Sequence, residues 1–138
     1  MRGDAGSLYD AHAVRLYAHG WSLLGDDAAA AVQDAFVAAV RHPPRGDTVL
    51  WMYGLSRTAA TSRGAFDRPW HVASGEADPL LRAAAALRAE QREALLLEAG
   101  EWLETPDIAH VLGLAPDTVR QLLHAARTRL ERGVLDAL

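Results

Sequence analysis

The sequence contains no cysteine, which excludes disulfide bonds, thiolate zinc sites and cysteine nucleophiles. Lysine is also absent, so all 14 basic residues are arginine. β-branched residues are few, and the single isoleucine is Ile108. Because alanine, leucine, arginine and glutamate dominate the composition and are strong helix formers, we predict an all-α fold.

Long apolar runs are missing as well. Residues 1–4 lack the apolar segment of a signal peptide, and no stretch approaches the roughly 18 apolar residues of a membrane span. We therefore expect a cytoplasmic protein. The net charge of −4 argues against a simple DNA-binding domain, because neutralisation of phosphates supplies most of the affinity of such domains.

No motif indicates a metal, a cofactor or an enzymatic activity. His12 and His19 are seven residues apart, beyond the i, i+4 spacing that places two imidazoles on one ion, and the other histidines lie on separate predicted elements. Ser56 and the other serines lack a Gly-x-Ser-x-Gly setting, and no glycine-rich phosphate loop follows a strand. We expect neither a metal site nor a catalytic site.

Hydrophobic periodicity predicts helices over most of the chain, with breaks at the clusters of proline and glycine. The first helix spans residues 8–24, Asp26 or Asp27 caps the second, and the third spans residues 48–62. The second helix has an apolar stripe made of Val32, Phe36, Ala39 and Val40. A fourth helix covers residues 79–99, and its expected inward side chains are Leu80, Leu87, Leu95 and Leu96.

A short helix, a turn at Gly113 and a second amphipathic helix then form a helix-turn-helix pattern. Thr105 supplies a hydroxyl N-cap for the short helix, and Pro106 suits its first position. The second helix begins at Pro116 and ends near residue 132. The expected core positions are Ile108, Ala109, Leu112, Leu114, Val119, Leu123, Ala126 and Leu130.

The outward positions of the last helix are polar and locally basic. They are Thr118, Arg120, Gln121, His124, Arg127 and Arg129. In such motifs the N-terminal half of the second helix contacts base edges and flanking residues bind phosphate, so we expect Thr118, Arg120, Gln121, His124 and Arg127 to bind DNA. Periodicity alone is equally consistent with a helical hairpin that has a solvated arginine face.

Three C-terminal segments resemble region four of the extracytoplasmic-function sigma factors in order and spacing. They are residues 87–97 (LRAEQREALLL), 107–114 (DIAHVLGL) and 118–130 (TVRQLLHAARTRL). In that family this region binds the −35 promoter element. The resemblance therefore implies promoter recognition by the helix-turn-helix, with no catalytic role for any residue.

Three N-terminal segments are similar to region two of the same family. They are residues 8–12 (LYDAH), 31–36 (AVQDAF) and 51–58 (WMYGLSRT). The resemblance implies that Gln33 and Asp34 dock on the β′ clamp helices of the RNA polymerase core. It also implies that Arg57 and Arg63 contribute to holding the −10 element of the promoter.

The resemblance divides the chain into two small helical domains joined by a linker. We expect a region two-like three-helix domain at residues 7–63, a linker at residues 64–79 and a region four-like helix-turn-helix domain at residues 80–135. Two aromatic residues of the linker, Phe66 and Trp70, have two possible roles. They either pack against a neighbouring helix or dock the two domains together in a compact form.

The contact faces depart from the family pattern. Ala29 and Ala30 occupy positions that are usually acidic, while Gly54, Leu122 and Ala125 occupy positions that are often basic. Each arginine lost from a phosphate contact lowers DNA affinity. Two functions stay open: a transcription initiation factor that binds polymerase and promoter DNA, and a degenerate sigma mimic that binds proteins, such as an anti-sigma factor, without promoter recognition.

Overall fold

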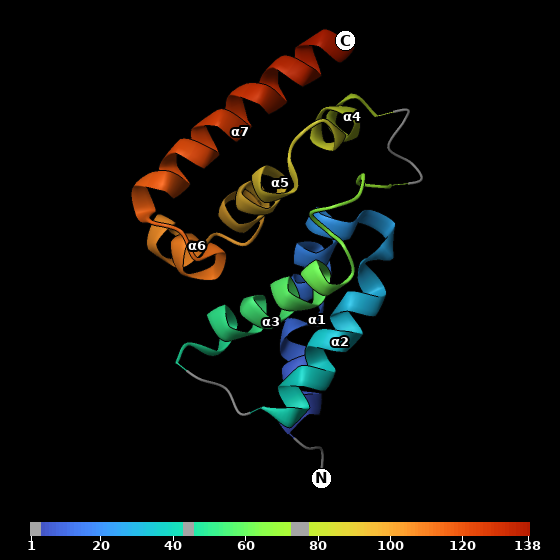
Figure 1. Cartoon of the computed structure of the whole chain (residues 1–138), viewed down its shortest axis with the longest axis vertical. Coiled ribbons are helices and arrows are strands. Elements are labelled where there is room, and N and C mark those ends of the chain that lie inside the picture. The colour runs from blue at the N-terminus through green and yellow to red at the C-terminus, as the bar shows by residue number, and fades with distance from the viewer. Residues whose placement is uncertain (1–3, 43–45, 73–77) are drawn as a thin grey trace.

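The computed structural model describes residues 4–42, 46–72 and 78–138, and every regular element in these ranges is helical (Figure 1). The predicted all-α fold is confirmed. Residues 43–45 of the first predicted break and residues 73–77 of the predicted linker lie outside the described residues, as do the side chains at 4–11. No described helix is both long enough and apolar enough to cross a bilayer.

The N-terminal half consists of α1 (Asp4–Leu24), α2 (Ala28–Arg41) and α3 (Thr48–Ser62). Helix α3 begins where Asp47 Oδ1 accepts a hydrogen bond of 3.0 Å from the Leu50 N–H. The predicted carboxylate cap of the second helix is wrong for Asp27, because its side chain makes no capping bond. A 3-10 turn at Gly25–Asp27 joins α1 to α2 instead.

The C-terminal half consists of α4 (Pro79–Ala85), α5 (Ala89–Leu95), a π-helical turn (Leu96–Gly100), α6 (Thr105–Leu112) and α7 (Pro116–Ala137). The single helix predicted for residues 79–99 is therefore wrong. The chain breaks between α4 and α5, where the Gln91 side chain caps the new helix by accepting a bond of 3.0 Å from the Arg88 N–H. Helix α7 also continues beyond its predicted end.

Three predicted positions at the helix ends need correction. Leu80, the second residue of α4, is 53% exposed. Leu114 is 39% exposed in the turn between α6 and α7. Glu104, rather than Thr105, precedes the first helical residue of α6, and no side chain caps that end.

One hydrophobic core runs through both halves of the protein. It joins Leu16, Met52 and Tyr53 of the N-terminal half to Leu97 and Ile108 of the C-terminal half, all of them at most 1% exposed. In Figure 1, α5 and α6 lie above α1 and α3. Helix α5 contacts α1, and α6 contacts α3. The two halves therefore pack as a closed unit.

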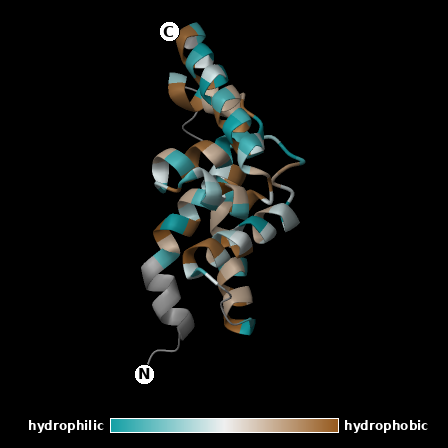
Figure 2. Ribbon diagram, turned by 90° about the vertical axis from the view of Figure 1, so that its left-hand side faces the viewer, coloured by the Kyte–Doolittle hydropathy of each residue, from teal (hydrophilic) through white to brown (hydrophobic). Residues whose placement is uncertain are grey.

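Each half also has packing of its own. A second apolar cluster lies almost entirely in the N-terminal half and contains Leu23, Leu24, Ala31, Ala35, Ala59, Ala60 and Ala65. In the C-terminal half, α7 crosses α4 so closely that a Cβ on Gly133 would lie 2.9 Å from Ala83 Cβ. Figure 2 shows hydrophilic and hydrophobic residues on different sides of α7, as its amphipathic pattern predicts.

The segment after α3 contacts both halves through Trp70. Its indole N–H donates to the Trp21 carbonyl at 2.7 Å, and the two indoles meet edge to face at 4.8 Å. On its other side, the Arg92 guanidinium lies 4.8 Å from the Trp70 ring centroid. Of the two roles left open by the sequence, Trp70 has the docking role, whereas Phe66 packs against Arg57 of the same half.

Candidate nucleic-acid interface

The last two helices form the helix-turn-helix that the sequence predicts. Gly113 ends α6 with a left-handed φ of 68°, a conformation that glycine adopts at little cost. The Leu114 N–H then bonds to the Ala109 carbonyl at 3.0 Å, which closes the turn. Ile108 and Val119 meet in the core at 0% exposure, so the inward phase of both helices is confirmed.

The predicted DNA-facing residues of α7 are all exposed, as is Arg129. Gln121 and His124 lie on the side of the helix opposite to the buried Val119 and Leu123, and Thr118, Arg120 and Arg127 are exposed at the borders of that buried side. The N-terminal half of α7 thus presents hydroxyl, guanidinium, amide and imidazole groups together. These are groups that bind base edges and phosphates.

The arginines predicted to bind DNA are already paired within the chain. The ion pairs are Arg57–Glu93, Arg63–Asp34, Arg120–Asp117 and Arg127–Glu98. Three of them are surface pairs, which stabilise a fold by at most about 1 kcal/mol and exchange readily for phosphate. The Arg57–Glu93 pair differs, since its carboxylate is fully buried and the two residues come from different halves.

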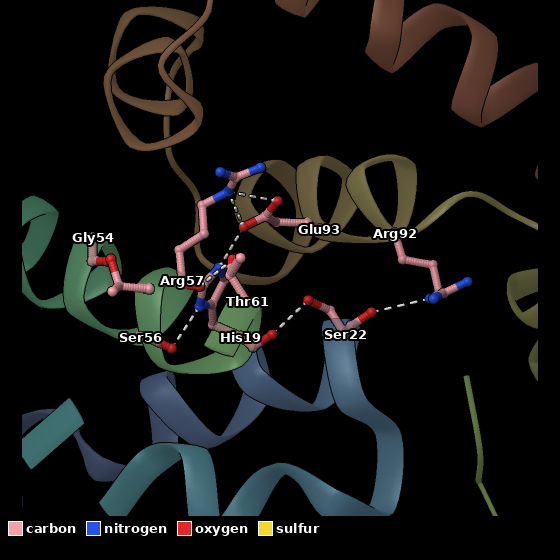
Figure 3. Close-up of polar contacts among 9 residues, drawn as sticks. His19, Ser22, Gly54, Ser56, Arg57, Thr61, Arg92 and Glu93 are labelled. Atoms are coloured by element: carbon pink, nitrogen blue, oxygen red, sulfur yellow. Dashed lines mark hydrogen bonds and ion pairs between the residues drawn. The ribbon is translucent and has the colours of Figure 1, made fainter. Parts of the chain in front are cut away.

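Glu93 is the centre of a buried polar cluster (Figure 3). Its carboxylate accepts from Arg57 Nε at 3.0 and 3.1 Å and lies 2.8 Å from His19 Nε2. The other ring nitrogen of His19 lies 2.7 Å from Ser56 Oγ. The sequence reasoning missed this cluster, although Glu93 precedes the buried Leu97 by four residues and so falls on the inward side of its helix.

Arg92, the neighbour of Glu93, is a second buried charge at the junction. Its guanidinium donates to the carbonyls of Ser22, Ala84 and Leu87 at 3.0, 3.2 and 2.6 Å. These carbonyls lie at or just beyond the C-terminal ends of α1 and α4, where the helix dipole favours a cation. Burial lowers the pKa of Arg92 to about 10, against the opposing effect of Glu90, so the side chain stays charged at neutral pH.

A groove of about 450 Å³ separates α3 from the helix-turn-helix. Its lining residues include Arg57 and Thr61 of α3 and Thr118 and Leu122 of α7. Arg57 is predicted to contact the −10 element and Thr118 the −35 element. In the closed fold both residues line this one groove. Leu122, at a position that is often basic in the family, is half-buried against the core.

The two residues predicted to bind polymerase point to different surroundings. Gln33 lines a shallow groove between α1 and α2, together with Val14, which is 84% exposed, and Tyr17. Asp34 is held by Arg63, and this contact lowers the pKa of its carboxyl group. The outer face of the N-terminal half therefore offers an apolar groove, not an acidic surface. The described residues contain no group of three or more His, Asp or Glu side chains that suits a metal ion.

Comparison with known proteins gives a family match for the C-terminal half. Residues 77–130 match the family model "Sigma-70, region 4", which covers α4 to most of α7. No curated protein is significantly similar to the chain in sequence.

Solved structures resemble this chain over nearly its whole length. The sigma factor RpoE, in complex with the anti-sigma factor NepR from Bartonella quintana, has 23% identity and a TM-score of 0.75, with 95% of this chain and 96% of that chain covered. CnrH in complex with the cytosolic domain of CnrY has 27% identity and a TM-score of 0.71, with coverages of 96% and 88%.

A third structure is similar in the same way. The PhyRSL–NepR complex from Sphingomonas sp. Fr1 has 23% identity and a TM-score of 0.78, with 96% of this chain and 90% of that chain covered. The two-part helical sigma fold predicted from the sequence is therefore confirmed.

Proposed function

We propose that this sigma-type protein is a transcription initiation factor that binds the RNA polymerase core and promoter DNA in the cytoplasm. The observation that carries the proposal is the exposed polar face at the start of α7, on a helix-turn-helix whose core is closed by Ile108, Val119 and Leu123. In this proposal residues 7–63 are the region two-like domain, residues 64–79 the linker and residues 80–135 the region four-like domain.

Fluorescence anisotropy with short duplex DNA in low salt tests the DNA contacts. Arg120→Ala is expected to weaken binding and to reduce the slope of log affinity against log salt by about one, if this residue binds a phosphate. Gln121→Ala is expected to relax sequence preference at one base pair. The control is Arg132→Ala, an exposed arginine further along the same helix. If the wild-type protein binds no duplex in low salt, the proposed DNA-binding function is wrong.

Polymerase binding is assigned to the α1–α2 groove that contains Gln33, with Asp34 available once Arg63 releases it. A helix of the β′ clamp would bury the exposed side chains of Val14 and Tyr17 in this groove. Gln33→Arg is expected to reduce capture of the protein by purified polymerase core, whereas His42→Arg, on an exposed residue directly after α2, is expected to leave capture unchanged. Equal capture of both variants would place the docking surface elsewhere.

The alternative is a sigma mimic that binds a protein partner, such as an anti-sigma factor, without recognising a promoter. It is supported by the net charge of −4, by the internal pairing of the arginines, and by similar proteins whose structures contain NepR or the cytosolic domain of CnrY. Promoter-dependent transcription by polymerase core plus this protein would exclude the mimic. Stable binding of a basic partner, with no transcription from any template, would favour it.

A further inference from the structure

We propose that the buried cluster of His19, Ser56, Arg57 and Glu93 is a lock that holds the two halves closed and keeps Arg57 from other ligands. We name these four residues the lock cluster. Its regulatory meaning rests on the proposed DNA-binding function, whereas its mechanical role does not. Glu93 is the key residue, because it is the one member supplied by the C-terminal half.

The lock cluster connects three helices. His19 comes from α1, Ser56 and Arg57 from α3, and Glu93 from α5. Every bond that Glu93 makes to His19 or Arg57 therefore crosses the boundary between the halves, at 2.8 to 3.1 Å. Figure 3 shows the Glu93 side chain pointing from α5 toward both partners.

The hydrogen-bond chemistry of the cluster is determined by the carboxylate. An ionised carboxylate only accepts, so His19 Nε2 carries a proton and donates to Glu93. Its Nδ1 then accepts from the Ser56 hydroxyl if the ring is neutral, or donates to it if the ring is charged. Each member thus depends on the Glu93 charge, and loss of that charge leaves Arg57 without its carboxylate.

The rest of the boundary combines apolar packing with the bond from Arg92 to the Ser22 carbonyl and a looser Arg15–Glu101 ion pair at 3.8 Å. Among the described ion pairs, those of the lock cluster are the ones whose carboxylate is fully buried, so this cluster is expected to control opening. Removing one partner of a buried ion pair is strongly destabilising, because it leaves a buried charge uncompensated.

Arg57 can recover water if the halves separate, since its side chain is already 29% exposed at the edge. The N-terminal half retains the Leu23–Leu24 cluster and the C-terminal half retains the α4–α7 packing, so opening costs less than unfolding.

In the closed form, Arg57 and Thr118 line one groove between α3 and the helix-turn-helix. A groove of about 450 Å³ is too small to admit a DNA duplex, so a duplex reaches Arg57 from inside it only after α3 separates from the helix-turn-helix. The Glu93 carboxylate moreover competes with phosphate for the same guanidinium. If only the open form binds DNA, the apparent DNA affinity of the protein equals the affinity of the open form multiplied by the fraction of molecules that are open.

The absence of cysteine allows a clean distance measurement. Spin labels on Arg41→Cys and Thr128→Cys, both exposed, report the separation of α2 and α7. In this background Glu93→Gln removes the charge with little change of shape. The matched control is Glu98→Gln, which removes a carboxylate that pairs with Arg127 inside the C-terminal half.

Glu93→Gln is expected to give a broader distance distribution extending to longer values, whereas Glu98→Gln keeps the wild-type distribution. Circular dichroism checks that the helices persist. If Glu93→Gln does not fold, Arg57→Met is measured instead and is expected to lengthen the distance in the same way. A wild-type distribution in the folded variant, or equal lengthening in Glu98→Gln, would overturn the lock.

DNA affinity separates the lock from the proposed function. If the open form is a minor state of about 10%, Glu93→Gln is expected to bind duplex DNA more tightly, by up to about tenfold when the variant is fully open. A longer distance together with unchanged DNA affinity would keep the lock and count against DNA binding. An unchanged distance with normal DNA binding would discard the lock and leave the proposed function intact.

Discussion

Arg63 Nε donates to Asp34 Oδ2 at 2.7 Å, so a residue predicted to bind DNA and one predicted to bind polymerase neutralise each other. Arg63 directly follows α3 and Asp34 lies on α2, and both side chains are more than 40% exposed. An exposed pair of this kind contributes little to stability. Its main consequence is that neither of these two side chains binds its predicted ligand without first breaking this contact.

The pair makes a prediction about pH. Because the hydrogen bond from Arg63 lowers the pKa of Asp34, the pair stabilises the fold above the ordinary aspartate pKa of about 3.9 and loses this effect as the pH falls through the lowered value. Arg63→Ala is expected to return the Asp34 pKa toward its ordinary value, as measured by carboxyl NMR. Arg41→Ala serves as control, and an unmoved Asp34 pKa in Arg63→Ala would contradict the pairing.

We expect the hydroxyl group of Tyr53 to destabilise the fold. The side chain is 1% exposed, and its oxygen has no hydrogen-bond partner among the described residues. Burial is the main cause that raises the pKa of the phenol above its usual range, and the charge and hydrogen-bonding capacity of the Glu101 carboxylate raise it further, although the contact falls short of a regular hydrogen bond. Tyr53→Phe should raise the free energy of unfolding by about 1 kcal/mol, because it removes a buried unsatisfied group.

Urea denaturation measures this change. Tyr17→Phe, on a side chain that is 45% exposed, is the control and should shift stability by less than about 0.5 kcal/mol. Destabilisation by Tyr53→Phe would mean that the hydroxyl group has a partner in solution.

Two glycines with left-handed backbones should respond differently to alanine. Gly113 has a φ of 68° and open space around it, so Gly113→Ala should cost only the backbone strain, about 1 to 2 kcal/mol. Gly25 has a φ of 60°, and a Cβ there would lie 1.9 Å from the His71 carbonyl oxygen. Gly25→Ala should therefore cost clearly more in denaturant unfolding. Equal losses would show that residue 71 moves away without penalty.

Release of Arg127 from Glu98 should strengthen DNA binding if α7 contacts phosphate. Glu98→Gln removes one negative charge and frees a guanidinium on the predicted DNA-facing side. We expect higher affinity and a salt dependence steeper by about one ion, measured by anisotropy from low to moderate salt. Glu131→Gln removes an exposed charge further along α7 and is the control. The prediction fails if both variants change the salt slope equally.

Much of the fold follows from local sequence patterns. The 4-3 spacing of Val119, Leu123 and Ala126 fixes the inward side of α7, and Gly113 requires a turn. These features depend on neighbours within two helical turns, which a single sequence contains. The break between α4 and α5 was not predictable in this way, because residues 83–89 are good helix formers and only tertiary contacts interrupt them.

The candidate site was predictable in position but not in its electrostatics. Exposure of Arg120 and Gln121 follows from helical phase, whereas the partner of Arg57 lies 36 residues further along the chain. Sequence spacing relates His19 only to His12, whereas its neighbours in the structure, Ser56 and Glu93, come from two other helices. Long-range ion pairs leave no periodic pattern in the sequence, so they appeared only with the structure.

A backbone contact next to Gly25 sets the length of the chain segment that connects the two halves. The Asp26 N–H bonds to the His71 carbonyl at 2.9 Å, which fastens the chain at residue 71 to the corner between α1 and α2. The chain then takes seven Cα-to-Cα steps from His71 to Asp78, where α4 is capped. A fully extended chain of that length reaches about 25 Å. Halves that move further apart than this must first release His71, so this single backbone bond limits how far α4 can travel from the corner between α1 and α2.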